Sequence, residues 1–421
     1  MAEARAVFLA GCGLPERWSD RRRFVVGELG FGTGLNLIAL LDVWRRTRPP
    51  GGHLHFFSIE AHPMAAAEAA RALSAWPEIA PLAALLTARW PGAARGFHRL
   101  DFPELAASAD IALMEAGAAL EAWTGHADAW FLDGFSPARN PAMWRPELLQ
   151  AVARRSAPGA RAATFTVAGT VRRDLAAAGF IVERRQGFGR KRHRLEARLV
   201  GEPVAERDWP RVAVIGGGIA GASLNRAFAA AGVTARLFSS PGPKASDGPA
   251  ALVAPRLDAG LEAPAALFAQ AFARAIGLYG DTPACVIARG ARQLTAGEKD
   301  VGRFRKIAAS DLFEPGSVRL VTGEADAASA LLLDRALVID PEAVLDAWLG
   351  PVGRAAVARL EHHTDSWRLL DEGGEELGRA DIVCLAAGHA SSDLWPLPLS
   401  PVRGQASVAG GVDWPVATLF A

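Results

Sequence analysis

The amino-acid sequence predicts two α/β domains in one chain, each built on a parallel sheet. Through the first half, short apolar runs alternate with alanine-rich helical stretches, a pattern typical of a parallel sheet covered by helices on both faces. A polar segment bounded by prolines, GEPVAERDWP at 201–210, then interrupts the alternation. Beyond it, the apolar run at 211–215 leads into a second glycine-rich turn. We therefore expect a Rossmann-like domain at 1–200, a linker at 201–210 and a second Rossmann domain at 211–421.

Composition narrows the class of protein. The 421 residues leave room for two or three domains, and a formal net charge of +1 means that any nucleic acid must be bound by a local basic patch. The cysteines Cys12, Cys285 and Cys384 lie far apart without metal or redox spacing, which favours a reducing compartment and no metal site. No apolar run reaches the roughly 18 to 20 residues needed to span a bilayer, so we expect a soluble, cytoplasmic protein with no membrane partner.

Apolar runs and the stretches between them predict the elements of the first half. The predicted strands are residues 24–29, 54–59, 111–114, 129–132 and 162–167, and the predicted helices include 35–45 and 64–75.

The first of these strands runs directly into a glycine-rich turn that precedes a helix. Glycine lets the backbone turn tightly and approach a ligand closely at a helix N-terminus. The sequence of the turn is Gly30-Phe31-Gly32-Thr33-Gly34. Taken alone, such a turn is as compatible with a simple structural role as with a binding site.

Acidic residues stand at the ends of three predicted strands. Glu28 lies where a carboxylate would accept the ammonium of a methionine group, and Glu60 lies where one would accept both ribose hydroxyls. Glu115 follows the next strand and is placed to lie beside an adenine. Together with the three glycines these acids fit an adenosine ligand that has no phosphate. Solvated surface acids around a tight turn are the alternative.

The most specific segment of the chain is DAWFLDGFSPARNPAMW at 128–144. A strand brings Asp133 to its carboxyl end, and the loop that follows covers the cleft where open α/β sheets bind ligands. A carboxylate in this place is able to take a proton from an attacking amine. The alternative is that Asp133 only caps a helix or forms a turn.

A basic segment closes the first half. It contains one aromatic residue, Phe188, among glycines, and arginines neutralise phosphates while an aromatic ring stacks on a splayed base. An edge strand protected by charge is the other interpretation, and the residues alone do not favour either one. The basic residues are Arg184, Arg185, Arg190, Lys191, Arg192, Arg194 and Arg198.

The second half opens with a dinucleotide-binding pattern. The strand at 211–215 is followed by Gly216, Gly218 and Gly221 in G-x-G-x-x-G spacing and by an alanine-rich helix, which places a pyrophosphate at the helix N-terminus. The acid expected about 20 residues further on is absent, because the next strand ends in Ser239-Ser240. A glycine turn without a ligand is the alternative.

The segment at 128–144, together with GELGFGTGLN at 27–36 and GFGRKR at 187–192, resembles the family of bifunctional tRNA 5-methylaminomethyl-2-thiouridine biosynthesis proteins. The resemblance covers nearly the whole chain. It implies methyl transfer from S-adenosylmethionine to the aminomethyl nitrogen of a wobble uridine, with Asp133 as the acid/base and Arg190, Lys191 and Arg192 on the tRNA. Two departures are that Glu115 stands where an aspartate is more usual, and that members have more chain before residue 1, which suggests a late start at Met1.

Three segments of the second half resemble the glycine/D-amino-acid oxidase type of FAD fold. They are ASDGPAALVAPR at 245–256, which contains Ser246, DIVCLAAGH at 381–389, which contains Gly388, and PVRGQ at 401–405, which ends in Gln405. The resemblance implies FAD-dependent removal of a carboxymethyl group from the same uridine before methylation. Members of this fold usually continue beyond PVRGQ, so we expect weak FAD binding and poor oxidation.

Two other functions use the same motifs. A small-molecule N-methyltransferase fused to a flavin amino-acid oxidase would share both glycine turns without needing the basic segment. A non-catalytic tRNA-binding protein would keep the folds without the chemistry. Binding of S-adenosylmethionine would distinguish the enzymes from the non-catalytic tRNA-binding protein. Dependence of methyl transfer on tRNA would distinguish the tRNA-modifying enzyme from the small-molecule N-methyltransferase.

Overall fold

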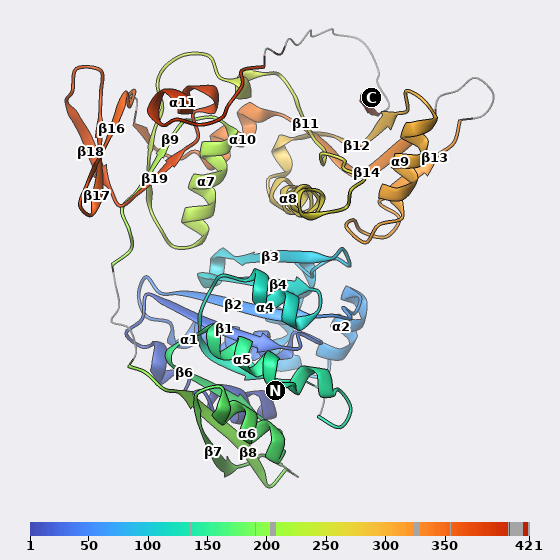
Figure 1. Ribbon diagram of the computed structural model, residues 1–421, viewed down its shortest axis with the longest axis vertical. Coiled ribbons are helices and arrows are strands. Elements are labelled where there is room, and N and C mark those ends of the chain that lie inside the picture. The colour runs from blue at the N-terminus through green and yellow to red at the C-terminus, as the bar shows by residue number, and fades with distance from the viewer. Residues whose placement is uncertain are drawn as a thin grey trace. The chain divides into compact units, whose positions relative to one another are not determined.

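The computed structural model describes residues 1–134, 137–189, 191–202, 208–323, 329–353, 355–402, 404 and 416–419. The chain divides into two units, Met1–Arg207 and Asp208–Ala421, and the division falls inside the segment expected to be a linker. Each unit has its own sheets and its own helices (Figure 1).

The first unit is built on one eight-stranded sheet in the order β3-β4-β2-β1-β5-β6-β8-β7. The five central strands are parallel, whereas β3 at one edge and the β8–β7 pair at the other run antiparallel. The strands are β1 (Arg23–Leu29), β2 (His53–Glu60), β3 (Gly96–Phe102), β4 (Ala107–Leu113), β5 (Ala127–Leu132), β6 (Ser156–Thr164), β7 (Phe180–Gln186) and β8 (His193–Leu199).

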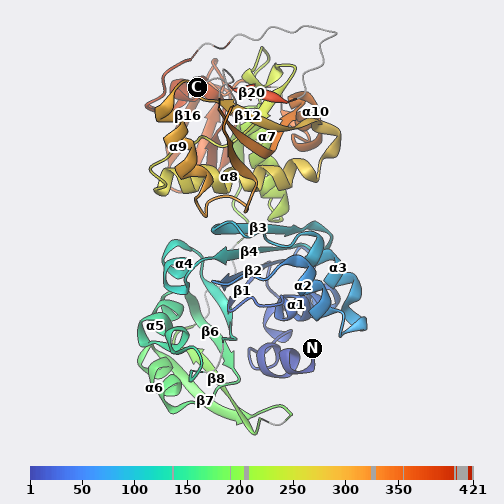
Figure 2. The ribbon, with the colours of Figure 1, turned by 90° about the vertical axis from the view of Figure 1, so that its right-hand side faces the viewer.

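Helices cover both faces of this sheet, as the alternating pattern predicted. The helices α1 and α3 lie on one face of the sheet and α4, α5 and α6 on the other (Figure 2). Their apolar side chains give the sheet a hydrophobic core on each side. The π-helix η1 (Ala4–Leu9) adds Val7 and Phe8 to the first core. The helices are α1 (Leu35–Thr47), α2 (Ala66–Leu73), α3 (Ala80–Ala88), α4 (Ala116–Ala122), α5 (Pro146–Arg154) and α6 (Gly169–Ala177).

The structure corrects the sequence-based boundaries at several points. The strand expected at 162–167 is β6, which ends at Thr164, where the Thr164 hydroxyl accepts a hydrogen bond from the Thr166 N–H and starts a turn. The strand expected at 111–114 begins four residues earlier, at Ala107. The sheet also contains three antiparallel strands toward its edges, β3, β7 and β8, that are not among the predicted strands. Their many polar side chains interrupt the apolar runs by which buried strands are recognised.

The second unit is divided among three sheets. The first is parallel, in the order β15-β10-β9-β19, and the helix α7 (Ile219–Ala230) connects β9 to β10. Its strands are β9 (Val212–Ile215), β10 (Ala235–Phe238), β15 (Val352–Gly353) and β19 (Ile382–Leu385). This is the strand–turn–helix–strand unit that the G-x-G-x-x-G spacing predicted.

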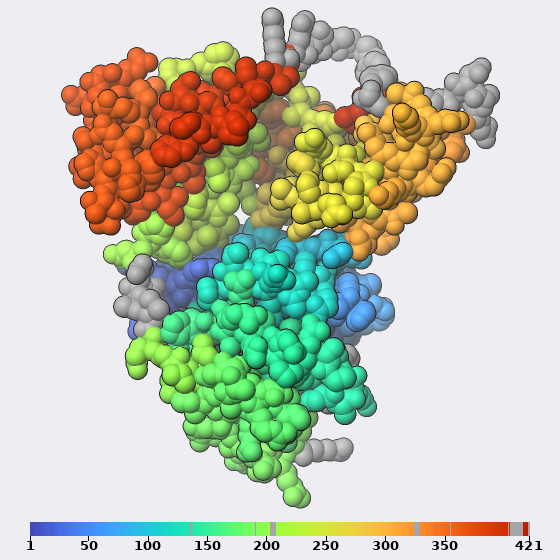
Figure 3. Space-filling model, in the orientation of Figure 1, coloured from blue at the N-terminus to red at the C-terminus, as the bar shows by residue number. Residues whose placement is uncertain are grey.

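A mostly antiparallel sheet, β11-β14-β12-β20 with β13 beside β14, packs against the helices α8 and α9. A third sheet, β16-β17-β18, projects at one side of this unit and is orange in the space-filling view (Figure 3). The strands are β11 (Ala251–Val253), β12 (Val286–Leu294), β13 (Val318–Val321), β14 (Ala330–Ile339), β16 (Arg359–His363), β17 (Ser366–Leu370), β18 (Glu376–Ala380) and β20 (Ala417–Leu419). The helices are α8 (Ala263–Gly280), α9 (Glu298–Ala308), α10 (Pro341–Trp348) and α11 (Ser391–Leu394).

Among the described residues, no helix has the length and hydropathy needed to cross a membrane. Within the same residues, no group of three or more His, Cys, Asp or Glu side chains is arranged to hold a metal ion.

Candidate active sites

The glycine turn of the first unit joins the carboxyl end of β1 to the start of α1. Gly30 has φ +95° and Gly34 has φ +72°, backbone conformations that residues with a Cβ rarely adopt. A Cβ on Gly30 would lie 2.5 Å from the backbone oxygen of Asp133, so this glycine also lets the turn touch the end of β5. Gly32, at φ +52°, has no heavy atom within 4 Å of its Cβ direction. The turn is therefore closely packed on the Asp133 side and open at Gly32, where a ligand would approach.

Glu28 lies deep at the end of β1, with 1% of its surface exposed. Its two oxygens accept hydrogen bonds from the Ser58 hydroxyl at 2.5 Å and from the Asn36 amide nitrogen at 2.9 Å. Burial raises the pKa of Glu28 well above its ordinary range, even though both hydrogen bonds oppose that shift. Contact of Glu28 with a methionine ammonium stays a prediction, and any such contact must share oxygens that Ser58 and Asn36 already use.

Asp133 lies immediately after β5, at the same sheet edge as the glycine turn. The Asn36 amide donates to its Oδ2 at 2.7 Å. Burial raises the pKa of Asp133 to about 6, and the Asn36 hydrogen bond and the charge of Lys191 partly offset the rise. A carboxylate with this pKa is mostly ionised at neutral pH and still basic enough to take a proton, as a general base must be.

Glu60 is held at the tip of β2 by two backbone donors. The Gly32 N–H donates to one oxygen at 3.0 Å and the His62 N–H to the other at 2.9 Å. This brings the Glu60 carboxylate to the open side of the glycine turn, as its predicted contact with ribose requires.

Glu115 follows β4 and starts α4. Its carboxylate accepts the Ala118 N–H at 3.1 Å and pairs with Arg145 at 2.8 Å. Glu115 and Arg145 line an open hollow of about 770 Å³ beside α4 and α5. The predicted contact with adenine remains a prediction, because the structure shows a helix cap and an ion pair at this residue.

The basic segment forms β7, β8 and the turn between them, so its strands do lie at a sheet edge. Two of its cations are paired with carboxylates of the same hairpin, Arg185 with Glu183 and Arg194 with Glu196. Within the described part of the chain, the exposed side chains of Arg184, Arg192 and Arg198 have no carboxylate partner. Arg190 lies outside the described residues.

Lys191 links this hairpin to the surroundings of Asp133. Its ammonium pairs with Glu3 at 2.7 Å and lies 3.9 Å from the ring centre of Phe165. The charges of Glu3 and Lys191 act in opposite directions on the pKa of Asp133, which burial raises. Lys191 of the hairpin and the predicted catalytic acid Asp133 are therefore close enough for their charges to interact. Their separation in the sequence gave no sign of this.

The second unit contains a pocket of about 690 Å³ beside its glycine turn. Gly216 has φ +122°, and a Cβ there would lie 2.2 Å from the backbone oxygen of Ala386. A Cβ on Gly221 would lie 1.8 Å from the oxygen of Gly216, so no larger residue fits without breaking the turn. Such a turn, at the start of α7 and open to a pocket, fits the pyrophosphate of FAD.

Other predicted flavin residues line the same pocket. Gly218, Ser246 and Gly388 all lie on its wall, and the Ser246 hydroxyl accepts the Ile219 N–H at 3.0 Å at the start of α7. Ser239 occupies the strand end where dinucleotide folds commonly carry an acid, with Lys244 nearby. Gln405 lies outside the described residues.

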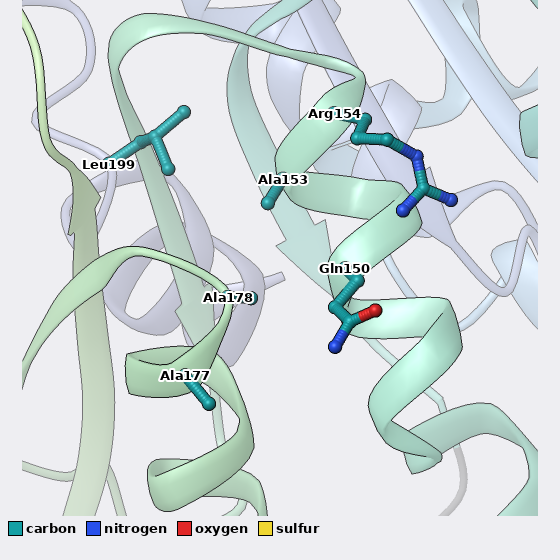
Figure 4. Close-up of a pocket in the computed structure, with 6 residues that line it drawn as sticks. All are labelled: Gln150, Ala153, Arg154, Ala177, Ala178 and Leu199. Carbon is teal, nitrogen blue, oxygen red and sulfur yellow. The ribbon is translucent and has the colours of Figure 1, made fainter.

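A smaller hollow of about 400 Å³ lies between α5 and α6 (Figure 4). Its lining is mainly small or aliphatic, apart from Gln150 and Arg154, and contains none of the residues that the sequence predicted for either site. We assign it no chemistry.

Fold and sites together define a fused protein, an S-adenosylmethionine-dependent methyltransferase unit followed by an FAD-dependent oxidoreductase unit. A family model described as S-adenosyl-L-methionine-dependent methyltransferase matches residues 77–200, and one described as FAD dependent oxidoreductase matches residues 211–418. The chain belongs to the family of tRNA 5-methylaminomethyl-2-thiouridine biosynthesis bifunctional proteins, MnmC, and the resemblance stated from sequence is confirmed.

Two relatives named MnmC document this membership. The MnmC protein of Caulobacter vibrioides is 57% identical over 429 residues, an alignment that covers 100% of this chain and 72% of that one. The MnmC protein of Maricaulis maris is 43% identical, with 99% of this chain and 71% of that one covered. The solved structure of MnmC2 from Aquifex aeolicus aligns with 48% of this chain and 63% of that one, at 24% identity and a TM-score of 0.39.

Sequence reasoning missed several residues of these sites. Asn36 donates to both Glu28 and Asp133, Ser58 donates to Glu28 alone, and Glu3 and Phe165 contact Lys191. Only Asn36 had a local signal, because it lies in the first turn of the helix that follows the glycine motif. The roles assigned to all these residues stay predictions.

Proposed function

We propose that the chain completes the side chain of a wobble uridine in tRNA in two steps. The second unit removes the carboxymethyl group of 5-carboxymethylaminomethyl-2-thiouridine, and the first unit methylates the amine that is left. The family membership and both glycine-turn sites support this assignment. A tRNA substrate supports a cytoplasmic location.

Methyl transfer is supported by Asp133, the partly buried carboxylate that shares a sheet edge with the glycine turn and Glu60. In the reaction, a bond forms between the aminomethyl nitrogen and the methyl carbon while the sulfur–carbon bond of S-adenosylmethionine breaks. Asp133 takes the proton that the nitrogen loses, and its pKa of about 6 suits that task at neutral pH.

Replacement of Asp133 tests this step. We expect Asp133→Ala to bind S-adenosylmethionine nearly as tightly as the wild type and to methylate aminomethyluridine tRNA about 100-fold more slowly. Single-turnover transfer of a radiolabelled methyl group measures the rate, and calorimetric titration measures donor binding. A wild-type rate in the variant would make Asp133 structural and remove it from the mechanism.

For the oxidative step, the turn at Gly216–Gly221 would hold the pyrophosphate of FAD, while Ser246 and Gly388 form other parts of the pocket wall. When bound, FAD supplies the two-electron oxidation of the carbon–nitrogen bond. Addition of water to the resulting imine then releases glyoxylate and leaves the aminomethyl group. Release of glyoxylate from carboxymethylaminomethyluridine tRNA tests the oxidative step. A substitution at Gly216 should abolish that release.

The tRNA backbone would be held by the β7–β8 hairpin. Its exposed Arg192 has no carboxylate partner in the described part of the chain and follows Lys191, whose charge acts on Asp133. Neutralising Arg190, Lys191 and Arg192 together should flatten the slope of log affinity against log salt by about two units, at roughly 0.7 to 0.9 per phosphate contact. An unchanged slope would move the tRNA contact elsewhere. Methylation of a free aminomethyl nucleoside as fast as of tRNA would instead favour a small-molecule methyltransferase.

A further inference from the structure

Asn36 lies between the two buried acids of the first unit. Only 7% of its surface is exposed, and it is the second residue of α1, directly after the glycine turn. Its amide nitrogen is 2.9 Å from Glu28 Oε1 and 2.7 Å from Asp133 Oδ2. One side chain therefore joins the end of β1 to the end of β5 at the point where methyl transfer is proposed to occur.

The chemistry of an amide fits this position closely. Its nitrogen carries two hydrogens, one for each carboxylate, whereas a hydroxyl has one hydrogen and an aliphatic group has none. The Ser58 hydroxyl fixes the other oxygen of Glu28, so Asn36 is anchored on a rigid partner. Asn36 is also the only described residue that donates a hydrogen bond to the Asp133 carboxylate.

We infer that Asn36 is a positioning residue for methyl transfer: it holds Asp133 Oδ2 through its amide and leaves Oδ1 to accept the proton of the substrate amine. The inference rests on the proposed methyltransferase function. It assigns Asn36 no contact with substrate or donor, because its amide hydrogens are already taken by Glu28 and Asp133.

A structural role alone makes a different prediction. If Asn36 only satisfied buried carboxylates, its loss would lower the stability of the first unit and leave the proton transfer unchanged. If it positions Asp133, its loss removes a hydrogen bond to the ionised carboxylate. The acid limb of the methylation rate must then move to higher pH, because the ionised form of Asp133 has lost a partner.

The test uses the full chain, radiolabelled S-adenosylmethionine and tRNA that carries aminomethyluridine. The variants are Asn36→Leu, which keeps the volume and removes the amide, Asn36→Ser, which is the second choice if Leu prevents folding, Asp133→Ala, and the double variant of positions 36 and 133. Asn225→Leu is the matched control, because the Asn225 amide also bridges two acceptors, the backbone oxygens of Trp348 and Leu349, each at 2.9 Å, but lies in the other unit.

We expect the Asn36 variant to methylate about 10- to 100-fold more slowly at neutral pH, with donor affinity changed by less than about threefold. The acid limb should move up by about one pH unit, the scale of one hydrogen bond to a charged group. Combined with Asp133→Ala, the Asn36 substitution should cause no further loss of rate. Asn225→Leu should leave both the rate and its pH profile unchanged.

An unmoved acid limb, or a rate loss that adds fully to that of Asp133→Ala, would overturn the inference. The proposed function fails separately, because it fails only if the wild-type chain does not methylate the tRNA. The variants of Asn36 therefore test the inference, and the wild-type chain tests the proposed function.

Discussion

The substitution Gly30→Ala tests whether the glycine turn positions Asp133 as well as the methyl donor. Gly30 has φ +95°, and an alanine forced into a left-handed conformation costs about 1 to 2 kcal/mol. In addition, its Cβ would lie 2.5 Å from the backbone oxygen of Asp133, an atom that no side-chain rotation can move away. The end of β5 would have to shift by about 1 Å to restore an ordinary contact distance.

Both consequences have expected sizes. Crowding of this kind typically lowers the free energy of unfolding by a further 1 to 3 kcal/mol, roughly. A shift of about 1 Å in a catalytic group commonly slows a reaction about 100-fold. Gly30→Ala should therefore be less stable than the wild type by about 2 to 5 kcal/mol and should methylate tRNA about 100-fold more slowly.

The matched control is Gly51→Ala, at φ +70°, where no heavy atom lies within 4 Å of the added Cβ. It carries the left-handed penalty without the clash, so it should lose only about 1 to 2 kcal/mol and keep its methylation rate. Urea unfolding and single-turnover methylation measure the two quantities. If Gly30→Ala methylates at the rate of Gly51→Ala, the contact between Gly30 and Asp133 has no role in positioning the acid.

Burial and packing also determine what substitutions at Asp133, His53 and Gly221 should do. Because burial raises the pKa of Asp133 from 3.8 to about 6, its ionised form destabilises the fold at pH 7. Asp133→Asn should therefore raise the free energy of unfolding by about 1 to 3 kcal/mol while slowing methylation about 100-fold; a loss of stability in urea unfolding would contradict this. Burial lowers the pKa of His53 to about 4, so stability is full above pH 6.5 and falls by up to about 3 kcal/mol as the pH drops from 6.5 to 4; His53→Gln should flatten this dependence in urea unfolding. Gly221→Ala, whose Cβ would meet the oxygen of Gly216 at 1.8 Å, should bind added FAD much more weakly than the wild type yet still methylate tRNA. Gly277→Ala, with no neighbour within 4 Å, should bind added FAD as the wild type does.

The sequence by itself determined the local units of this protein. A strand that runs into closely spaced glycines and then into a helix is specified within about 20 consecutive residues, so both glycine turns were predictable from their order and spacing. Glu28, Glu60 and Asp133 were also predictable as strand-end residues, because parallel strands bring their carboxyl ends to one edge of the sheet. The antiparallel edge strands β3, β7 and β8 were not, since mixed polar and apolar side chains there conceal the strand pattern.

Only the tertiary structure decided what these residues touch. Asn36, Glu28 and Asp133 are up to 105 positions apart in the chain, and Lys191 and Glu3 are 188 apart. Whether such residues come within hydrogen-bond distance depends on the order of the strands and the placement of the helices. That arrangement is determined by the burial of apolar side chains over the whole sheet. The pKa of Asp133 has the same origin, because it depends on how much water the surrounding elements exclude rather than on the residues beside it in the chain.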